Sequence, residues 1–122
     1  MPAIGSAGPT AHLSYPIPVG KMTEKLRFTI LGCGSSGGVP RVGNQWGVCD
    51  PLNTLNKRRR CALLVEAIAH DGGVTTSLFD TGGDLREQLL SAHVTNLDGV
   101  LLTHPNADHI FGLDDLRQLA IS

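Results

Sequence analysis

The stretch Thr103-His104-Pro105-Asn106-Ala107-Asp108-His109 places three potential metal ligands within six residues, directly after an apolar segment. Zinc is bound by imidazole nitrogen at roughly 2.0–2.1 Å and by carboxylate oxygen at roughly 2.0–2.2 Å, usually with four ligands. His104, Asp108 and His109 supply three ligands of this chemistry. Because a loop between a strand and a helix can bring them to one point, the spacing predicts a metal site. The alternative is that these residues only cap the next helix, a role that Asp108 alone can fill.

The apolar pattern on either side of this stretch predicts a sheet with helices packed against it. Four segments have the alternation or the β-branched content of strands: 26–31, 62–68, 74–79 and 97–103. The polar turn between the second and the third predicts a hairpin, and the fourth has the most buried character. Two segments have helical spacing: 84–92 and 113–121. Together they predict an α/β (α+β) domain over residues 22–122, with a mostly antiparallel or mixed sheet and helices on one face.

Composition restricts the class of protein. At 122 residues, with 41% hydrophobic and 17% charged residues, the chain is typical of one soluble globular domain. Its net charge of −1 gives no general attraction to nucleic acid, and no apolar run approaches the roughly 20 residues that span a membrane. Residues 1–21, rich in Pro, Gly, Ala and Ser, are predicted to be a disordered tail or an over-extended gene start. Because no secretion signal is evident and there are only three cysteines, we predict a cytoplasmic protein.

Three further motifs accompany the metal-ligand stretch. Asp80-Thr81-Gly82 ends the third predicted strand, Leu31 to Pro40 (LGCGSSGGVP) opens a glycine-rich loop, and Gly112 to Arg117 (GLDDLR) follows the ligands. With these motifs the chain resembles the metallo-β-lactamase superfamily, whose signature is His-x-His-x-Asp-His. Within it the chain is most similar to the PhnP-like branch, which contains the cyclic phosphodiesterase of phosphonate breakdown, and to relatives of tRNase Z. The resemblance covers Leu26 to Ile121, and it implies the N-terminal half of an αββα sandwich.

The resemblance implies a role for each matching residue. His104 would bind a first metal ion, Asp108 and His109 would bind a second, and Asp80 would support the metal loop without binding metal. The ions would be zinc or manganese, and they would share a hydroxide that Asp108 helps to orient, which makes Asp108 the candidate catalytic residue. The implied activity is hydrolysis of a small phosphodiester or a nucleotide-like substrate.

One position departs from the family signature, because Asn106 stands where the second histidine belongs. A neutral amide oxygen is a poor ligand for zinc compared with imidazole, and the remaining family ligands come from the second half of the fold. We therefore expect weak metal binding and an incomplete or impaired catalyst. The alternative is a non-catalytic remnant or binding module that retains half of the fold. Half of a sandwich leaves one apolar sheet face uncovered, which predicts a homo-oligomer or another association through that face.

Other motifs have competing explanations. Gly32 to Gly37 (GCGSSG) matches the dinucleotide-binding pattern, but Gly38 and Pro40 oppose the helix that such a site requires. The run Lys57-Arg58-Arg59-Arg60 has the charge to meet nucleic acid or a phosphate-bearing substrate. A solvated loop is favoured for it, so nucleic acid is not an expected partner, although this run leaves it open. Trp46 is predicted either to cover the pocket or to anchor the loop.

Overall fold

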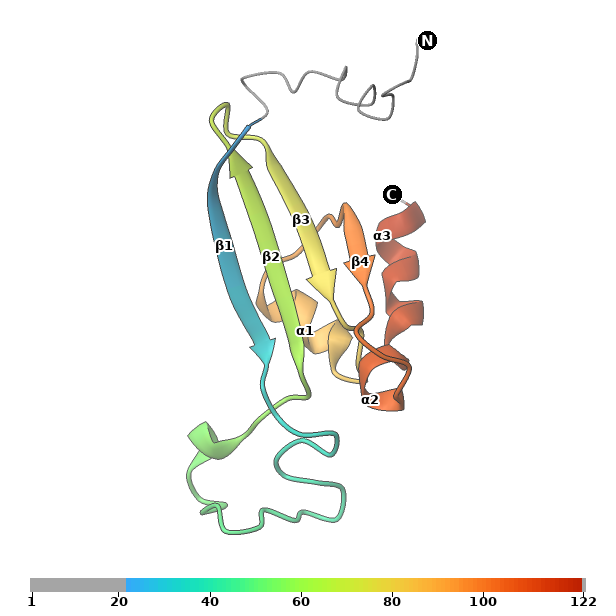
Figure 1. The fold of residues 1–122 in the computed structure, drawn as a ribbon. Helices are drawn as coiled ribbons and strands as arrows, with labels where there is room; N and C mark the ends of the chain where they lie inside the picture. The colour runs from blue at the N-terminus through green and yellow to red at the C-terminus, as the bar shows by residue number, and fades with distance from the viewer. Residues whose placement is uncertain (1–21, 122) are drawn as a thin grey trace, which may run out of the picture.

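The computed structural model describes residues 22–121, which form a four-stranded mixed sheet with helices on one side (Figure 1). The strands are β1 (Thr23–Gly32), β2 (Ala62–Ala69), β3 (Val74–Phe79) and β4 (Gly99–Leu101). They lie in the order β1-β2-β3-β4; the first two pairs are antiparallel and the last pair is parallel. The predicted class, a mixed sheet carrying helices, is confirmed. The prediction made for residues 1–21 lies outside the described part of the chain.

The hairpin between β2 and β3 forms where the sequence predicts it. Its register pairs Leu63 with Phe79 and Ile68 with Val74. The turn is closed by a hydrogen bond from Ala69 N to Gly73 O at 2.8 Å. Glycine suits this turn because Gly72 has φ +88°, a conformation that other residues adopt only with strain.

The core lies between the inner face of the sheet and the helices. Helix α1 (Leu85–Ser91) connects β3 to the parallel strand β4 and contributes Leu85 and Leu89 to the core. The sheet contributes Leu31, Ala62, Leu64 and Leu78. The predicted helix over 113–121 is a 3-10 turn, η4 (Leu113–Leu116), followed by α3 (Arg117–Ile121). None of the described helices is long and apolar enough to cross a membrane.

The expectation that 97–103 is the most buried strand is wrong. Only Gly99–Leu101 is a strand, and Val100, Leu101 and Leu102 are 37%, 49% and 46% exposed. The physical reason is position: β4 is at the edge of the sheet and pairs only with β3. An apolar run of this kind predicts burial on both faces, which the described residues do not provide.

The outer face of the sheet is apolar and uncovered by the described residues. Leu26, Phe28 and Ile30 alternate along β1 on this face and are 54%, 62% and 71% exposed. Ile30 is paired with Leu63, which is paired in turn with Phe79, so the apolar surface continues across three strands. Figure 1 shows α1 behind the sheet and no helix in front of it. Apolar patches of this kind mark association surfaces or drive aggregation.

We expect the chain to self-associate through this outer face. Sedimentation velocity should show a dimer or a larger species for the wild type. The double substitution Phe28→Glu/Ile30→Glu should shift the distribution toward monomer, because association would then bury two charges in an apolar contact. Lys25→Glu is the control, since Lys25 is also on β1 but alternates to the other face. A wild-type chain that stays monomeric at its highest soluble concentration would contradict the prediction.

Candidate metal centre

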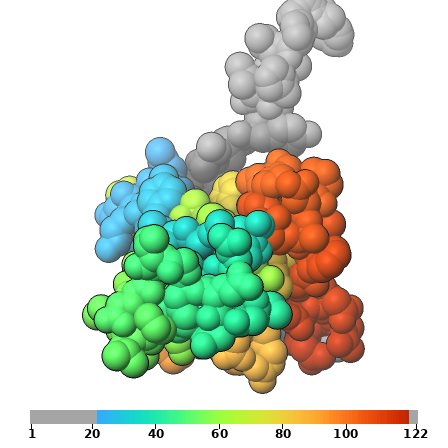
Figure 2. Space-filling model, turned by 90° about the horizontal axis from the view of Figure 1, so that it is seen from below, coloured from blue at the N-terminus to red at the C-terminus, as the bar shows by residue number. Residues whose placement is uncertain are grey.

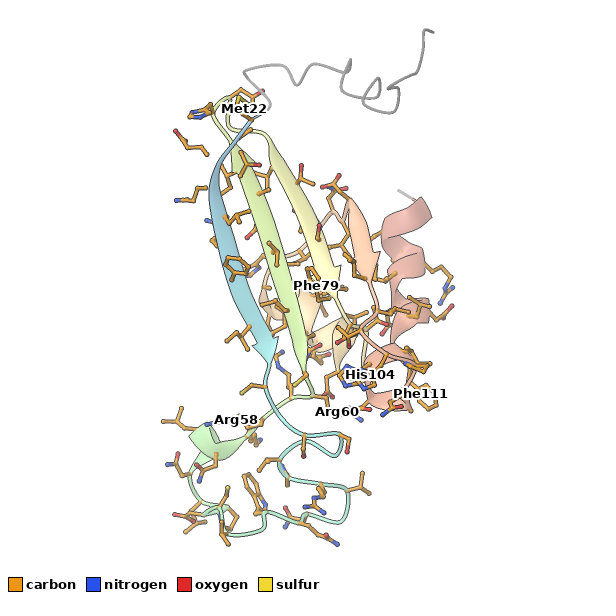
Figure 3. All side chains as sticks on the ribbon, in the orientation of Figure 1. Met22, Arg58, Arg60, Phe79, His104 and Phe111 are labelled. Atoms are coloured by element: carbon orange, nitrogen blue, oxygen red, sulfur yellow. The ribbon has the colours of Figure 1, made fainter. Side chains whose placement is uncertain are left out.

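The predicted ligands lie at the end of the sheet where β3 and β4 finish (Figure 3). Asp80 follows β3 directly, and its backbone N–H donates to Leu101 O at 2.8 Å, which joins the turn to β4. Asp80 has φ +72°, a left-handed conformation that is uncommon for a residue other than glycine. This conformation turns the chain out of the sheet and leaves the Asp80 carboxylate buried, with the residue 6% exposed.

The Asp80 carboxylate organises the loop that carries the ligands. It accepts hydrogen bonds from Thr103 N at 2.8 Å and from the Thr103 hydroxyl at 2.8–2.9 Å. It also contacts His109 Nδ1 at 2.8 Å. Burial raises the pKa of Asp80, but the hydrogen bonds from Thr103 and His109 outweigh it and leave the pKa below its ordinary value of 3.8. The group is therefore a carboxylate at neutral pH.

This network also determines which nitrogen of each histidine faces the site. An ionised carboxylate can only accept hydrogen bonds, so His109 Nδ1 carries the proton in its contact with Asp80. The Thr103 hydroxyl already donates to Asp80, so at its 3.0 Å contact with His104 Nδ1 it must accept. In both rings Nδ1 is the donor, so in the neutral imidazole it is Nε2 that carries the lone pair a metal ion requires. A carboxylate behind the imidazole is the common arrangement for metal-binding histidines.

The structure brings the three predicted ligands together. One ligand atom from each of His104, Asp108 and His109 lies within 4.8 Å of the other two. The two imidazole rings have centroids 3.8 Å apart, and His109 Nε2 is 3.0 Å from Asp108 Oδ2. Ligands of one tetrahedral zinc ion are about 3.3 Å apart, given bond lengths near 2.0–2.1 Å. Small side-chain rotations would bring all three to one ion, so the donor set fits a divalent cation with three protein ligands.

Direct backbone contacts hold the ligand loop against the turn that follows β3. Thr81 N donates to His109 O at 2.8 Å, and Gly112 N donates to Thr81 O at 2.7 Å. A Cβ atom at Gly82 would lie 2.3 Å from Asp108 O, so only glycine permits this approach. The Asp80-Thr81-Gly82 motif therefore positions Asp108 and His109 through the main chain as well as through the Asp80 carboxylate.

Asn106 begins the short helix α2 (Ala107–Ile110), which the sequence interpretation treated as part of the loop. Its backbone carbonyl accepts from His109 N at 2.9 Å, but its side chain makes no capping hydrogen bond and is exposed. Capping of a helix by Asp108 is not observed, because Asp108 lies inside the first turn. The position where the family signature has a histidine is therefore accessible to solvent.

Sequence reasoning missed two residues that support the site. Thr103 is the first residue of the stretch Thr103 to His109, but only its contacts show that it connects Asp80 to His104. Arg60 was counted as one of a basic run, yet its guanidinium donates to Asp84 at 2.8 and 2.9 Å and its backbone N–H donates to the same carboxylate. The hydrogen bond from Arg60 keeps the pKa of Asp84 below its ordinary value despite partial burial. An arginine and an aspartate 24 residues apart carry no sequence signal for this pairing.

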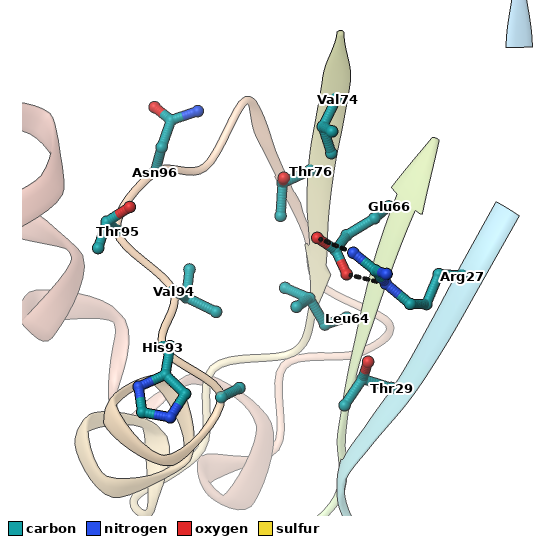
Figure 4. Close-up of a pocket in the computed structure, with 11 residues that line it drawn as sticks. Arg27, Thr29, Leu64, Glu66, Val74, Thr76, His93, Val94, Thr95 and Asn96 are labelled. Atoms are coloured by element: carbon teal, nitrogen blue, oxygen red, sulfur yellow. Dashed lines mark hydrogen bonds and ion pairs between the residues drawn. The ribbon is translucent and has the colours of Figure 1, made fainter. Parts of the chain in front are cut away.

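A cavity lies away from the ligand cluster, on the helix side of the sheet (Figure 4). It has a volume of 480 Å³ and lies between the sheet and the segment 92–96. Its main charged groups neutralise one another, because Arg27 Nε is 2.9 Å from Glu66 Oε1. The hydrogen bond from Arg27 lowers the pKa of Glu66. Its charges are paired, and the cluster of potential metal ligands found among the described residues lies elsewhere. This cavity is therefore not the candidate active site.

Comparison with known proteins agrees with this geometry. The sequence profile of the metallo-beta-lactamase superfamily matches residues 61–121, half of the chain, and the matched part contains all three ligands and Asp80. The chain belongs to the metallo-β-lactamase superfamily. Among solved structures, this metallo-β-lactamase chain is similar to a diphosphatase of the PhnP family, with 39% identity and a TM-score of 0.66. It is also similar to Zn²⁺-bound PqqB from Methylobacterium extorquens, with 25% identity and a TM-score of 0.53.

These similarities cover most of the chain but a minor part of each relative. The match to the diphosphatase covers 78% of this chain and 36% of that one, and the match to PqqB covers 77% and 34%. A protein named octanoyltransferase from Porphyromonas gingivalis is 45% identical over 94 residues, which is 77% of this chain and 18% of that protein. The chain thus spans about a third of the solved relatives and less than a fifth of the curated one.

Substitution of Asp80 tests the role of its carboxylate. We expect Asp80→Asn to weaken Zn²⁺ binding about 10–100-fold, because the amide cannot accept from both Thr103 and His109 while keeping both histidines in the metal-binding tautomer. Isothermal titration calorimetry provides the measurement. Asp115→Asn is the matched control, since Asp115 is exposed and outside the ligand cluster. Equal Zn²⁺ affinity for wild type and Asp80→Asn would show that the carboxylate only stabilises the fold.

Proposed function

We propose that this chain belongs to a metal-dependent hydrolase that cleaves phosphodiesters, with His104, Asp108 and His109 as its metal ligands. The observation that carries the proposal is the orientation of the two imidazoles. Contacts that lead back to the single Asp80 carboxylate occupy Nδ1 of both rings, so Nε2 is the nitrogen left for a metal ion, and His109 Nε2 lies 3.0 Å from Asp108 Oδ2. A proton or a divalent cation between these nitrogen and oxygen atoms would be stabilised, because their lone pairs otherwise repel one another.

Each residue of the site has a distinct part in this proposal. His104 and His109 supply neutral nitrogen ligands, and Asp108 supplies a negative oxygen ligand. A divalent ion held by these three residues would supply the positive charge that makes hydroxide available near neutral pH. Asp108 is 18% exposed at its side chain, so its carboxylate can accept a hydrogen bond from that water and orient it toward phosphorus. Asp80 and Thr103 hold the two histidines in position.

The substrate class rests on the most informative structural relative. The solved protein with 39% identity is described as a diphosphatase of the PhnP family, and its similarity covers 78% of this chain. This supports a phosphorus–oxygen bond as the target. The Zn²⁺ named for the PqqB structure supports zinc as the ion, and manganese is the alternative. The octanoyltransferase name does not redirect the proposal, because 18% of that protein matches this chain. The ligand cluster contains no acyl-carrying nucleophile, and metal-assisted hydrolysis does not need one.

A second candidate function is a non-catalytic binding module. The observation that favours it is Asn106, which is exposed and offers only an amide where the family signature has imidazole. A site with three strong ligands binds metal less firmly than one with four. A chain that folds but binds metal weakly would keep the binding surface typical of the family and would lack the metal-dependent catalysis.

Hydrolysis of bis(4-nitrophenyl) phosphate with added Mn²⁺ or Zn²⁺ separates the two functions. The proposed hydrolase should release nitrophenol in proportion to enzyme, and Asp108→Asn should abolish this release because the ion loses its one anionic ligand. Asp98→Asn is the control, since Asp98 lies outside the ligand cluster and bonds Thr76 N. Absence of metal-dependent release in the wild type, or equal release by Asp108→Asn, would favour the binding module.

Restoring the family ligand is a separate test of the metal site. Asn106→His should strengthen Zn²⁺ binding at least about tenfold, because an imidazole replaces a weak amide ligand. The backbone already allows it: Asn106 is extended, with φ −66° and ψ 147°, and its exposed side chain has no capping bond to lose. Titration calorimetry under identical buffer and pH gives the comparison, with His104→Ala in the Asn106→His background as control. Unchanged affinity, or no loss in the control, would mean that the loop is not a metal loop.

A further inference from the structure

Charge is strongly segregated along this nearly neutral chain. The segment 33–61 holds five basic residues and one acidic residue, a net charge of +4. The rest of the chain holds five basic and ten acidic residues, a net charge of −5. A separation of this size within one small domain creates a local positive field, which favours an anionic ligand at that segment.

The positive segment 33–61 is a folded loop (Figures 1 and 2). It lies at the same end of the sheet as the candidate metal ligands. Its two ends are tied together by backbone hydrogen bonds. Val39 and Arg58 exchange N–H···O bonds of 2.9 Å, and Gly34 N donates to Arg59 O at 2.7 Å. These bonds place the glycine-rich part of the loop beside the basic run. Between them is a cavity of 270 Å³, lined by residues 37–40, by Val42, by residues 57–60 and by Asp84.

Only one of the four cations in this cavity is neutralised by a carboxylate among the described residues. Arg60 is paired with Asp84 at 2.8 Å. Arg58 donates to the neutral carbonyl of Lys57 at 2.8 Å, and Arg59 donates to the Ser91 hydroxyl at 3.2 Å. Lys57 has no ion pair with any described residue. The four cations and the one carboxylate, Asp84, give the lining of this cavity a net charge of +3.

We infer that this cavity is a binding site for a phosphoryl group, formed by Lys57, Arg58 and Arg59. Guanidinium and ammonium groups are the protein donors that match phosphate oxygens in charge and geometry. The volume of 270 Å³ lies just below the range of drug-sized pockets, about 300–1,000 Å³, and therefore suits a small anion. A long nucleic acid fits less well, because it would also meet the net negative charge of the remaining chain.

The cavity adjoins the candidate metal centre through Arg60. A Cβ atom built on Gly82 lies 2.3 Å from Asp108 O and 4.0 Å from Arg60 Cβ, so Arg60, which lines the cavity, is also close to the ligand loop. A substrate with two phosphoryl groups can place one at the metal centre and the other among the three cations. This link to substrate rests on the proposed function. Anion binding by the cavity does not, because it needs no metal.

Titration calorimetry with inorganic pyrophosphate in EDTA tests the site without metal or hydrolysis. We expect saturable binding that weakens with added salt, since surface charges are screened. Lys57→Gln/Arg58→Gln should weaken it about tenfold or more, because charge-assisted hydrogen bonds are lost. Lys25→Gln/Arg86→Gln removes the same charge from exposed positions outside the cavity and should bind like the wild type. Circular dichroism checks that both variants fold, and Lys57→Gln alone is the milder substitute.

Two results would overturn the inference. One is the absence of saturable pyrophosphate binding, or equal binding by the wild type and Lys57→Gln/Arg58→Gln. The other is tight binding of a single-stranded oligonucleotide that pyrophosphate does not displace, which would assign the positive loop to nucleic acid. Because EDTA removes metal, a failed hydrolysis assay leaves this measurement intact, and a failed pyrophosphate titration leaves the hydrolysis assay intact.

Discussion

The buried carboxylate of Asp80 is the constraint on which the rest of the site depends. An ionised group with the residue 6% exposed is costly unless every lone pair has a partner, and here the partners are Thr103 and His109. Those partners lie more than twenty residues further along the chain, so satisfying Asp80 requires the ligand loop to close over the end of β3. The left-handed backbone of Asp80 serves the same purpose, because it turns the carboxylate toward that loop.

This constraint makes the ligand cluster a property of one strand–helix–strand unit. The turn after β3 and the loop after β4 are held together by the Asp80 carboxylate and by the backbone contacts of Thr81 and Gly82. The parallel pairing of β3 with β4 brings their carboxyl ends to the same edge of the sheet, which is where loops of parallel strands form sites. The three ligands are therefore arranged without any contribution from the uncovered outer face. We therefore expect the number of ligands, rather than their placement, to limit metal binding at this candidate centre.

Sequence predicted the parts of this arrangement that depend on local pattern. The strands 62–68 and 74–79 were visible from β-branched residues around a turn, and the ligands His104, Asp108 and His109 from their spacing. Contacts between distant segments were not visible. The pairing of Arg60 with Asp84 depends on how the basic loop folds back against α1, and no local pattern encodes that. The exposure of Leu101 had the opposite cause: its sequence is that of a buried strand, and the described residues provide no layer to bury it.

The basic loop and the carboxylates around the ligand cluster lie at the same end of the sheet, and their charges offset one another. Asp80, Asp84 and Asp108 would repel a phosphodiester if they stood alone, since each is negative and a phosphodiester is an anion. Arg60 neutralises Asp84, and its charge also reaches Asp108, which in turn raises the pKa of Arg60. The remaining cations of the loop, Lys57 to Arg59, line the same cavity as Arg60. An anion that enters the cavity therefore meets a net positive charge, although Asp84 also lines it. Under the proposed function, a divalent cation among the ligands would extend that positive surface to the reacting bond, so the loop and the candidate metal centre would favour the same class of substrate by the same physical means.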